Sequence, residues 1–222
     1  MTNLMMSDKS SVSRLRAMVR VAALALCATI LGAGANTPAR ADEPMSVVQT
    51  TVNQALEVLR NKSIPLPQRQ DQLRKIVDAT FDFKEMARSA LGYHWRQITP
   101  DQQQEFTDAF VAFIQDSYLG KINEYTNQQV QFVTTKSLGQ GYAQVNTDIV
   151  KPSGNGDAIK VNYLLEQEGS SWKIYDVTVD AISIIANYRN QFNRVMNNQG
   201  YDTLIKDLKS KQAALAASLA NH

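Results

Sequence analysis

The residues of this chain that could do chemistry are few, and the first is a histidine. His94 stands between Tyr93 and Trp95, and the only other histidine is His222. An imidazole can act as a general base, but at the end of a predicted helix it can equally pack with its aromatic neighbours. The sequence has no Gly-x-Ser-x-Gly motif and no His-x-x-x-His pair, and one histidine cannot anchor a zinc ion. We therefore expect no hydrolytic triad and no metal site.

Two carboxylates on one predicted strand are the second candidate. Asp176 and Asp180 lie close together in a run of apolar residues. A buried carboxylate could serve as the base of a small isomerase or hydrolase, with Tyr163 or Tyr175 as the oxyanion donor. The alternative is an aspartate bonded to the backbone or to Arg189. Because no nucleophile is matched with a base, we expect a binding protein and not an enzyme.

The elements that would position such groups meet in the segment 172–192. Its first half alternates β-branched or aromatic residues with polar ones, which is typical of a strand. Its second half places Ile184, Ile185, Tyr188 and Phe192 at the three- and four-residue spacing of a helix. So many apolar side chains without reactive groups favour the wall of a cavity over an active site.

The N-terminal residues are typical of an export signal. Basic residues lead to an apolar run of 11 residues at 21–31, and Ala39-Arg40-Ala41 matches a small-x-small cleavage site. The run is too short to span a bilayer, which takes about 20 apolar residues. We predict a cleaved secretory signal peptide over 1–41 and one domain over 42–222. The only cysteine, Cys27, would leave with the signal, and with it any thiolate site.

Removal of this signal also changes the charge of the chain. It carries five of the 23 basic residues and one of the 21 acidic residues, so the formal charge changes from +2 to −2. No clustered basic face remains that would bind nucleic acid. The 181 residues of the mature chain are enough for one core with a cavity. We expect a monomer that needs no cofactor.

The periodicity of the mature chain predicts helices, then strands, then helices. Helices are predicted at 46–61, 68–79, 83–93 and from 100 onward, strands at 130–138, 142–150, 158–167 and 172–180, and two last helices divided at 198–200. The long helix from Pro100 has the clearest start, because Thr99 and Gln102 form a capping box. Short Gly-rich turns, one of them at 152–156, make the strands antiparallel. The fold class is α+β: a four-stranded curled sheet with helices around an apolar cavity, and an Ala-rich tail that frays from about 212.

Several short motifs resemble a known family. They are Phe83-Lys84-Glu85-Met86-Ala87-Arg88, Ala90-Leu91-Gly92 with Trp95, Thr99-Pro100 with Gln103, Tyr175-Asp176-Val177 with Ser183, and Asn187-Tyr188-Arg189-Asn190-Gln191-Phe192. Their order and spacing, behind an export signal, resemble the MlaC/toluene-tolerance family of periplasmic phospholipid-binding proteins. The resemblance runs from about Val47 to Leu208.

The resemblance implies a carrier that shuttles phospholipid through the periplasm and maintains outer-membrane lipid asymmetry. It implies a cone of helices around a twisted antiparallel sheet, similar to nuclear-transport-factor-2-like folds, with phospholipid as cargo. The implied partners are an inner-membrane ABC transporter with an MCE-domain subunit and an outer-membrane lipoprotein–porin complex. A hopanoid-associated branch of the family, a small isomerase or hydrolase of the same fold, and a purely structural adaptor remain as alternatives.

The candidate lipid-binding residues are the apolar side chains predicted to face inward from the sheet and the helices. They are Phe83, Met86, Phe106, Phe110, Val145, Ile149, Val161, Tyr163, Leu165, Val177, Val179, Ile182, Ile184, Tyr188 and Phe192. Phe106 and Phe110 belong to an aromatic helical stripe, and such a stripe forms a packed core as readily as a ligand wall. Arg189 points either to solvent or to a lipid phosphate at the mouth of the cavity.

Overall fold

The computed structural model describes residues 43–119, 127–150 and 157–220. These residues form two compact units, which we call the sheet unit and the helical unit. The sheet unit consists of 43–82, 127–150 and 157–181, and the helical unit consists of 83–119 and 182–220. The signal peptide predicted over 1–41 and the turn predicted at 152–156 lie outside the described residues.

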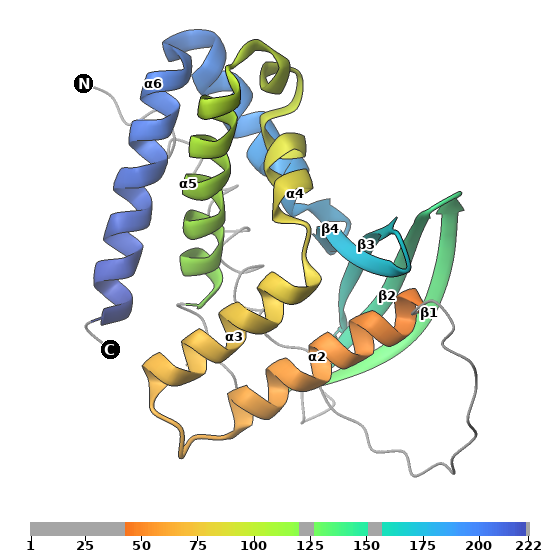
Figure 1. The fold of residues 1–222 in the computed structure, drawn as a ribbon. Coiled ribbons are helices and arrows are strands. Elements are labelled where there is room, and N and C mark those ends of the chain that lie inside the picture. Colours follow the sequence, from red (N-terminus) through yellow and green to blue (C-terminus); the bar gives the residue numbers. More distant parts are fainter. Residues whose placement is uncertain (1–42, 120–126, 151–156, 221–222) are drawn as a thin grey trace, which may run out of the picture. The chain divides into compact units, whose positions relative to one another are not determined.

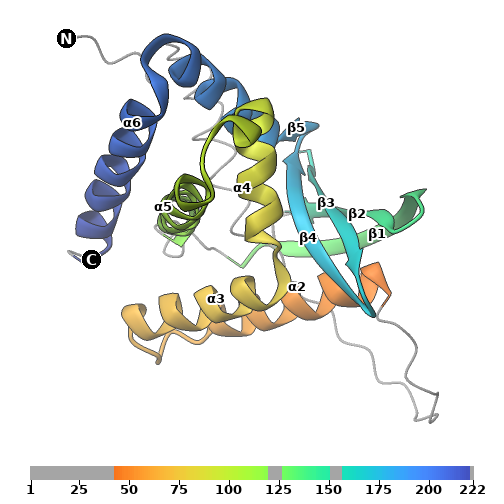
Figure 2. The ribbon, with the colours of Figure 1, turned by 45° about the horizontal axis from the view of Figure 1, so that its top comes forward.

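Two helices open the sheet unit. Helix α2 (Pro44–Arg60) and helix α3 (Leu66–Thr80) run side by side in opposite directions (Figures 1 and 2). Proline lies in the first turn of each helix, where its missing amide leaves no hydrogen bond unmade. The buried stripe of α2 is Val48, Val52, Leu56 and Leu59. This spacing gives α2 the apolar face that it packs against β1 and β2, the first two strands of the sheet.

The strands form an antiparallel meander. They are β1 (Gln129–Gly139), β2 (Tyr142–Val150), β3 (Ile159–Glu168), β4 (Ser171–Val179) and β5 (Ile182–Ser183), and the order in the sheet is β1-β2-β3-β4-β5. Helix α3 is tied to β4, because the amide of Asp82 donates to the carbonyl of Ile174 at 2.9 Å. Strand β1 is the outer strand of the sheet, and most of its side chains are exposed.

Alternate residues of the middle strands are buried on one face of the sheet. On β2 these are Ala143, Val145, Thr147 and Ile149, and the residues between them are more exposed. The strand period of two therefore separates an apolar face from a polar one, as the sequence predicted.

Besides β5, four elements form the helical unit. They are α4 (Phe83–Leu91), the 3-10 helix η1 (Gly92–Gln97), α5 (Pro100–Leu119) and α6 (Ile184–Ala220). Helix α6 packs against both α4 and α5 (Figure 2). It begins after Ser183, whose hydroxyl accepts a hydrogen bond from the amide of Ala186 at 2.8 Å, as an N-cap does.

The capping box predicted for α5 is present. The amide of Thr99 donates to Oε1 of Gln102 at 3.0 Å, and the amide of Gln102 donates to Oγ1 of Thr99 at 3.3 Å. Each side chain thus satisfies a backbone amide that the helix itself cannot. Asp101 adds negative charge to the first turn, where the helix dipole favours it.

The predicted α+β class, with N-terminal helices, an antiparallel sheet and C-terminal helices, is confirmed with local corrections, whereas the apolar cavity stays a prediction. The sheet has five strands and not four, because the chain pairs once more over Ile182–Ser183 before it turns helical. The helix predicted over 83–93 ends at Leu91, because Gly92 adopts a positive φ of 63° that stops an α-helix. Gly200, with φ 80° and ψ 179°, divides α6 where a break was predicted. Helix α6 continues to Ala220, past the position where fraying was predicted.

A polar cluster joins α5 to the second part of α6. Glu105 accepts a hydrogen bond from Lys209 Nζ at 2.6 Å and one from the Tyr201 hydroxyl at 3.1 Å. The Lys209 hydrogen bond is the main cause that lowers the pKa of Glu105 below its ordinary value of 4.5, and the Tyr201 hydrogen bond adds to it. Burial is the main cause that raises the pKa of the Tyr201 hydroxyl.

The lowered pKa of Glu105 predicts a small loss of stability in acid. A carboxylate whose pKa falls on folding stabilises the protein above its unfolded pKa, and that contribution disappears as the pH falls through the folded pKa. Between about pH 6 and pH 3, the free energy of unfolding of wild type should therefore fall by up to about 0.5–1 kcal/mol more than that of Glu105→Gln. The difference is small because both side chains of the Glu105–Lys209 pair are partly exposed to solvent. Urea unfolding across this pH range measures the difference. Parallel pH profiles would contradict the prediction.

Candidate functional site

His94 is part of the packing in the helical unit. Its side chain is buried, with only 4% exposed, and its ring lies 3.9 Å from that of Tyr93 between centroids. Nδ1 lies 3.1 Å from Oε1 of Gln97, and Nε2 lies 3.0 Å from Oδ1 of Asn193. Both ring nitrogens are therefore engaged by amide side chains that fix η1 against α6. This arrangement matches the packing alternative and leaves neither nitrogen to act as a base.

The two aspartates of the predicted strand stabilise its backbone. The register between β3 and β4 shifts at Leu164 and Leu165, and Asp176 at this bulge accepts the amide of Val177 at 2.7 Å. Asp180 is exposed, and its carboxylate accepts the amide of Lys160 at 3.1 Å in a turn where its φ is positive at 46°. The backbone-bonded alternative is confirmed for both residues.

Tyr163 is also engaged. Its side chain lies on the apolar face of the sheet, where its hydroxyl is hydrogen-bonded to Thr147, and Thr147 donates to the carbonyl of Val161 at 2.9 Å. Burial raises the pKa of the Tyr163 hydroxyl, so the phenol stays neutral. This hydroxyl pair is thus satisfied within the sheet, which lets the strands bury it among aliphatic residues.

The apolar face of the sheet unit brings seven of the candidate residues together. They are Val145, Ile149, Val161, Tyr163, Leu165, Val177 and Val179, and each is at most 8% exposed. Val145 is paired with Tyr163 and Tyr163 with Val177, while Val161 is paired with Val179. Paired residues point to the same side of a sheet, so β2, β3 and β4 present one continuous apolar surface.

The helical unit contains the other eight candidates. Phe106, Phe110, Tyr188 and Phe192 form a cluster of aromatic rings between α5 and α6, with centroids 5.6–6.1 Å apart in edge-to-face and stacked pairs. Met86 is also buried. Phe83 and Ile184 are partly exposed. Ile182 is 45% exposed and lies at the surface.

Phe113 belongs to this aromatic cluster although it was not among the candidate residues. Its ring lies 5.7 Å from that of Tyr188. Burial raises the pKa of Tyr188 to about 12, so its hydroxyl remains neutral in this apolar setting. The helical spacing of Phe106, Phe110 and Phe113 was the signal that placed all three on one helix face.

One polar atom beside the aromatic cluster stands out. Nδ2 of Asn187 is buried and has no hydrogen-bond partner among the residues that the structure describes. An unsatisfied buried amide costs about 1–3 kcal/mol. Such an atom commonly marks the place of a ligand or a water molecule.

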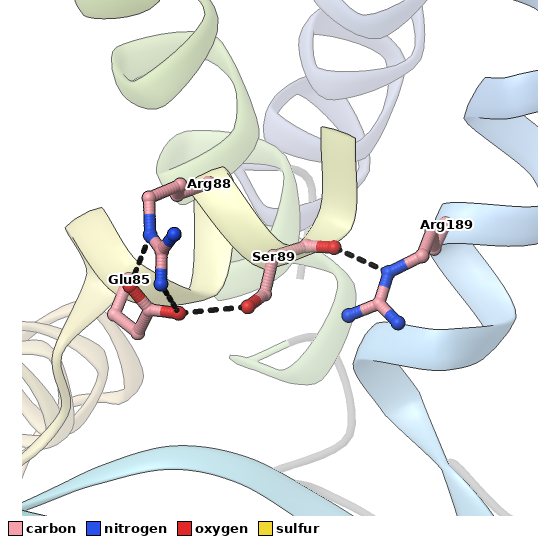
Figure 3. Close-up of polar contacts among 4 residues, drawn as sticks. All are labelled: Glu85, Arg88, Ser89 and Arg189. Atoms are coloured by element: carbon pink, nitrogen blue, oxygen red, sulfur yellow. Dashed lines mark hydrogen bonds and ion pairs between the residues drawn. The ribbon is translucent and has the colours of Figure 1, made fainter. Parts of the chain in front are cut away.

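Arg189 joins α6 to the end of α4 (Figure 3). Its Nε donates to the carbonyl of Ser89 at 2.6 Å, and its aliphatic stem lies against Gly92, where an added Cβ would be 3.4 Å away. On α4, Glu85 accepts hydrogen bonds from Ser89 Oγ at 2.8 Å and from Arg88 Nη2 at 2.7 Å. A cation at the last carbonyls of a helix is favourable because of the helix dipole.

Replacement of Arg189 by alanine should lower the free energy of unfolding by about 1–1.5 kcal/mol, because α4 loses a charged hydrogen-bond donor at its C-terminal end. The matched control is Arg194→Ala, which removes an exposed arginine from the same helix and should change stability by less than about 0.5 kcal/mol. Urea unfolding of both variants checks the prediction. Equal losses in the two variants would show that the Ser89 contact contributes nothing.

No group of three or more histidine, cysteine, aspartate or glutamate side chains that could hold a metal ion occurs in the described part of the chain. Within the same residues, no helix has the length and hydropathy to cross a bilayer.

A family model described as "MlaC protein" matches residues 49–210. The chain belongs to the MlaC family. It is 26% identical over 123 residues to the "Intermembrane phospholipid transport system binding protein MlaC" of Haemophilus influenzae. This alignment covers 54% of this chain and 56% of that protein. It is 29% identical over 168 residues to the "Toluene tolerance protein ttg2D" of Pseudomonas putida, which covers 73% of this chain and 77% of that protein.

A solved structure of another protein has the same fold. The phospholipid-binding protein of Ralstonia solanacearum, determined in complex with a phospholipid, has a TM-score of 0.69 with this chain. The two are 24% identical, and the match covers 80% of this chain and 99% of that one. This match shows that the order of helices, antiparallel sheet and helices is a fold already seen in a solved protein.

Sequence reasoning missed two polar residues of this MlaC-family chain. Asn187 lies inside a family motif, but its buried amide carries no sequence signal of its own. Arg69 lies on a helix that reads as amphipathic and solvated, yet its side chain is buried. The sequence signal that could have pointed to Arg69 was its place in the first turn of a helix. A positive charge is unfavourable there, and this turn contains no acidic residue to neutralise it.

Proposed function

We propose that this chain carries phospholipid through the periplasm between the outer and inner membranes, and so maintains outer-membrane lipid asymmetry. One observation carries the proposal: a protein that shares the fold over 80% of this chain holds a phospholipid. The names of the curated relatives, an intermembrane phospholipid transport protein and a toluene tolerance protein, support it. The predicted export signal over 1–41 supports a periplasmic location.

The apolar surfaces match what such a carrier must provide. Two acyl chains contain roughly thirty methylenes, and exposing each to water costs about 0.8 kcal/mol, so unprotected transit would cost over 20 kcal/mol. A carrier must therefore cover nearly the whole of both chains. The seven buried residues on the sheet face are the surface that we assign to this task.

The polar atoms of the described residues agree with binding and not with turnover. His94, Asp176 and Tyr163 all make hydrogen bonds within the protein. By contrast, the buried amide of Asn187 has none among the described residues, and a ligand oxygen could satisfy it. We propose that the chain is a carrier without covalent chemistry.

The proposed partners are membrane complexes at the two ends of the route. They are an outer-membrane lipoprotein–porin complex and an inner-membrane ABC transporter with an MCE-domain subunit. Lipid would move by partitioning when docking exposes the apolar surfaces, and any energy would come from the transporter. Of the basic residues Lys206, Lys209 and Lys211 in the second part of α6, Lys206 is exposed and is a candidate docking residue, whereas Lys209 is bonded to Glu105 and Lys211 is partly buried.

Phospholipid exchange between two vesicle populations tests this function. Donor vesicles carry an isotope-labelled phospholipid, and the purified mature chain should increase label transfer to acceptor vesicles in proportion to its concentration. An unrelated soluble protein of similar size is the control. Transfer no faster than with the control, by a folded and delipidated chain, would contradict a carrier function.

A further inference from the structure

Among the residues that the structure describes, a buried arginine of the sheet unit has two guanidinium nitrogens without a hydrogen-bond partner. Arg69 is the fourth residue of α3 and is only 6% exposed. Its Nε and Nη1 atoms are buried and have no hydrogen-bond partner among the described residues. A guanidinium keeps its charge in proteins, and an isolated buried charge is strongly unfavourable. The folded chain therefore gains stability from any anion that reaches these two atoms.

From helix geometry we expect the Arg69 side chain to lean toward the start of its helix. Side chains of a helix lean toward its N-terminal end, and Lys62 lies in the turn that precedes α3. Burial and then the positive charge of Arg69 lower the pKa of Lys62, so the two cationic groups lie within electrostatic range of each other. Two cations at one turn repel each other unless an anion lies between or beside them.

The backbone at this turn adds to the positive potential. The N-cap of α3 is Pro65, no side chain caps the first amides, and the first turn contains no acidic residue. Pro67 contributes no amide to this turn and the amide of Arg69 donates to the carbonyl of Pro65, but the helix dipole still makes such an end attractive to anions. Three features of this turn thus favour a negative charge at the same place: the N-terminal end of α3, the buried guanidinium of Arg69 and the ammonium group of Lys62.

We propose that the turn between α2 and α3 is a phosphate-binding site in which Arg69 is the main ligand. The planar guanidinium offers its two unpaired N–H groups to two phosphate oxygens, and Lys62 and the start of α3 add positive charge. The phosphate belongs either to a phospholipid headgroup or to free inorganic phosphate. Only the first of these sources depends on the function proposed above.

Inorganic phosphate alone provides the first test. In the delipidated mature chain, phosphate should raise the melting temperature by about 3–5 °C at roughly ten times its dissociation constant, relative to chloride at equal ionic strength. In Arg69→Met, which keeps an unbranched side chain but removes the charge, this rise should disappear. The matched control, Lys75→Met, removes an exposed cation from the same helix and should keep the full rise.

A pair of lipids distinguishes the two sources. Vesicles that contain phosphatidylglycerol or the diacylglycerol with the same chains differ in the phosphoglycerol headgroup, which carries the only phosphate. If the site takes the headgroup, Arg69→Met should weaken capture of phosphatidylglycerol at least about tenfold and leave diacylglycerol capture unchanged. If only the melting shift depends on Arg69, the site takes free phosphate. If the wild-type chain captures neither lipid, the carrier function is contradicted. The melting-temperature test with inorganic phosphate then decides whether the Arg69 site exists.

A second variant, Arg69→Lys, keeps the proposal testable if Arg69→Met does not fold. Arg69→Lys retains the charge but loses the planar pair of donors, so it should bind phosphate about tenfold more weakly than wild type. The proposal is overturned if wild type shows no phosphate-specific shift and no Arg69-dependent preference for phosphatidylglycerol. It is equally overturned if Arg69→Lys and Arg69→Met both behave as wild type in both assays.

Discussion

Replacing Phe110 with alanine is expected to lower the free energy of unfolding by about 3–5 kcal/mol. Phe110 is fully buried on α5, and its ring centroid lies 5.8 Å from that of Phe106, 6.1 Å from that of Tyr188 and 6.0 Å from that of Phe192. Its removal loses the transfer free energy of a large side chain and leaves a void that its rigid neighbours cannot fill. Urea unfolding of the delipidated chain measures the loss.

A graded control separates packing from ligand contact at Phe110. Phe110→Leu keeps most of the apolar volume and should lose less than about 1.5 kcal/mol. Phe110→Ala and Phe192→Ala should also be non-additive, because the two rings are in contact. If Phe110→Ala costs less than about 1.5 kcal/mol and instead empties the protein of lipid, the ring is a ligand wall and not a core residue.

Introducing tryptophan at Val145 is expected to reduce bound phospholipid at least about tenfold while the chain stays folded. Val145 is fully buried in the middle of β2, opposite Tyr163, on the surface that we assign to the acyl chains. A bulky ring there takes up space that a chain of methylenes would occupy, at about 0.8 kcal/mol for each methylene displaced. Lipid extraction with mass spectrometry measures the content, and circular dichroism confirms folding.

If Val145→Trp instead unfolds the protein, the region around Val145 is a filled core and not a lipid-binding surface. In a filled core, the added volume would force side chains off their rotamers and destabilise the protein by about 1–3 kcal/mol or more. The control is Tyr142→Trp, at the exposed start of the same strand, which should change neither lipid content nor stability. A Val145→Trp chain that unfolds, beside a wild type without lipid, would favour the structural adaptor.

Most of the fold could be predicted from the sequence, because strong local signals coincide with its elements. The capping box of Thr99 and Gln102 fixed the start of α5, and alternating residues such as Val145 and Thr147 fixed the inward face of β2. The end of α4 was missed by two residues, since whether Gly92 continues a helix or takes a positive φ depends on its tertiary surroundings.

The short strand β5 could not be predicted for a similar reason. Two residues are too few to show a period, and Ile182–Ser183 pair only because Asp180 and Ala181 both adopt positive φ and turn the chain back. Neither aspartate nor alanine at such a position is a turn signal as strong as Asn-Gly. The turn is instead held by the hydrogen bonds of Asp180 with Lys160.

The candidate site could be predicted in kind but not in its details. Apolar residues on the sheet and on α6 were identified from spacing alone, and the structure buries most of them. Ile182 was misjudged, because an apolar residue at an element boundary has no periodic partners to show which way it faces. Asn187 and Arg69 were missed because burial of a polar side chain depends on tertiary packing, which a sequence pattern does not encode.

The most direct test of the account is to identify what the mature chain carries when it is purified from a bacterial periplasm without detergent. Native mass spectrometry followed by lipid extraction should find about one phospholipid per chain, and the bound mass should be lost on delipidation. A folded chain with no phospholipid above the level of an unrelated periplasmic protein prepared in the same way would contradict the central claim.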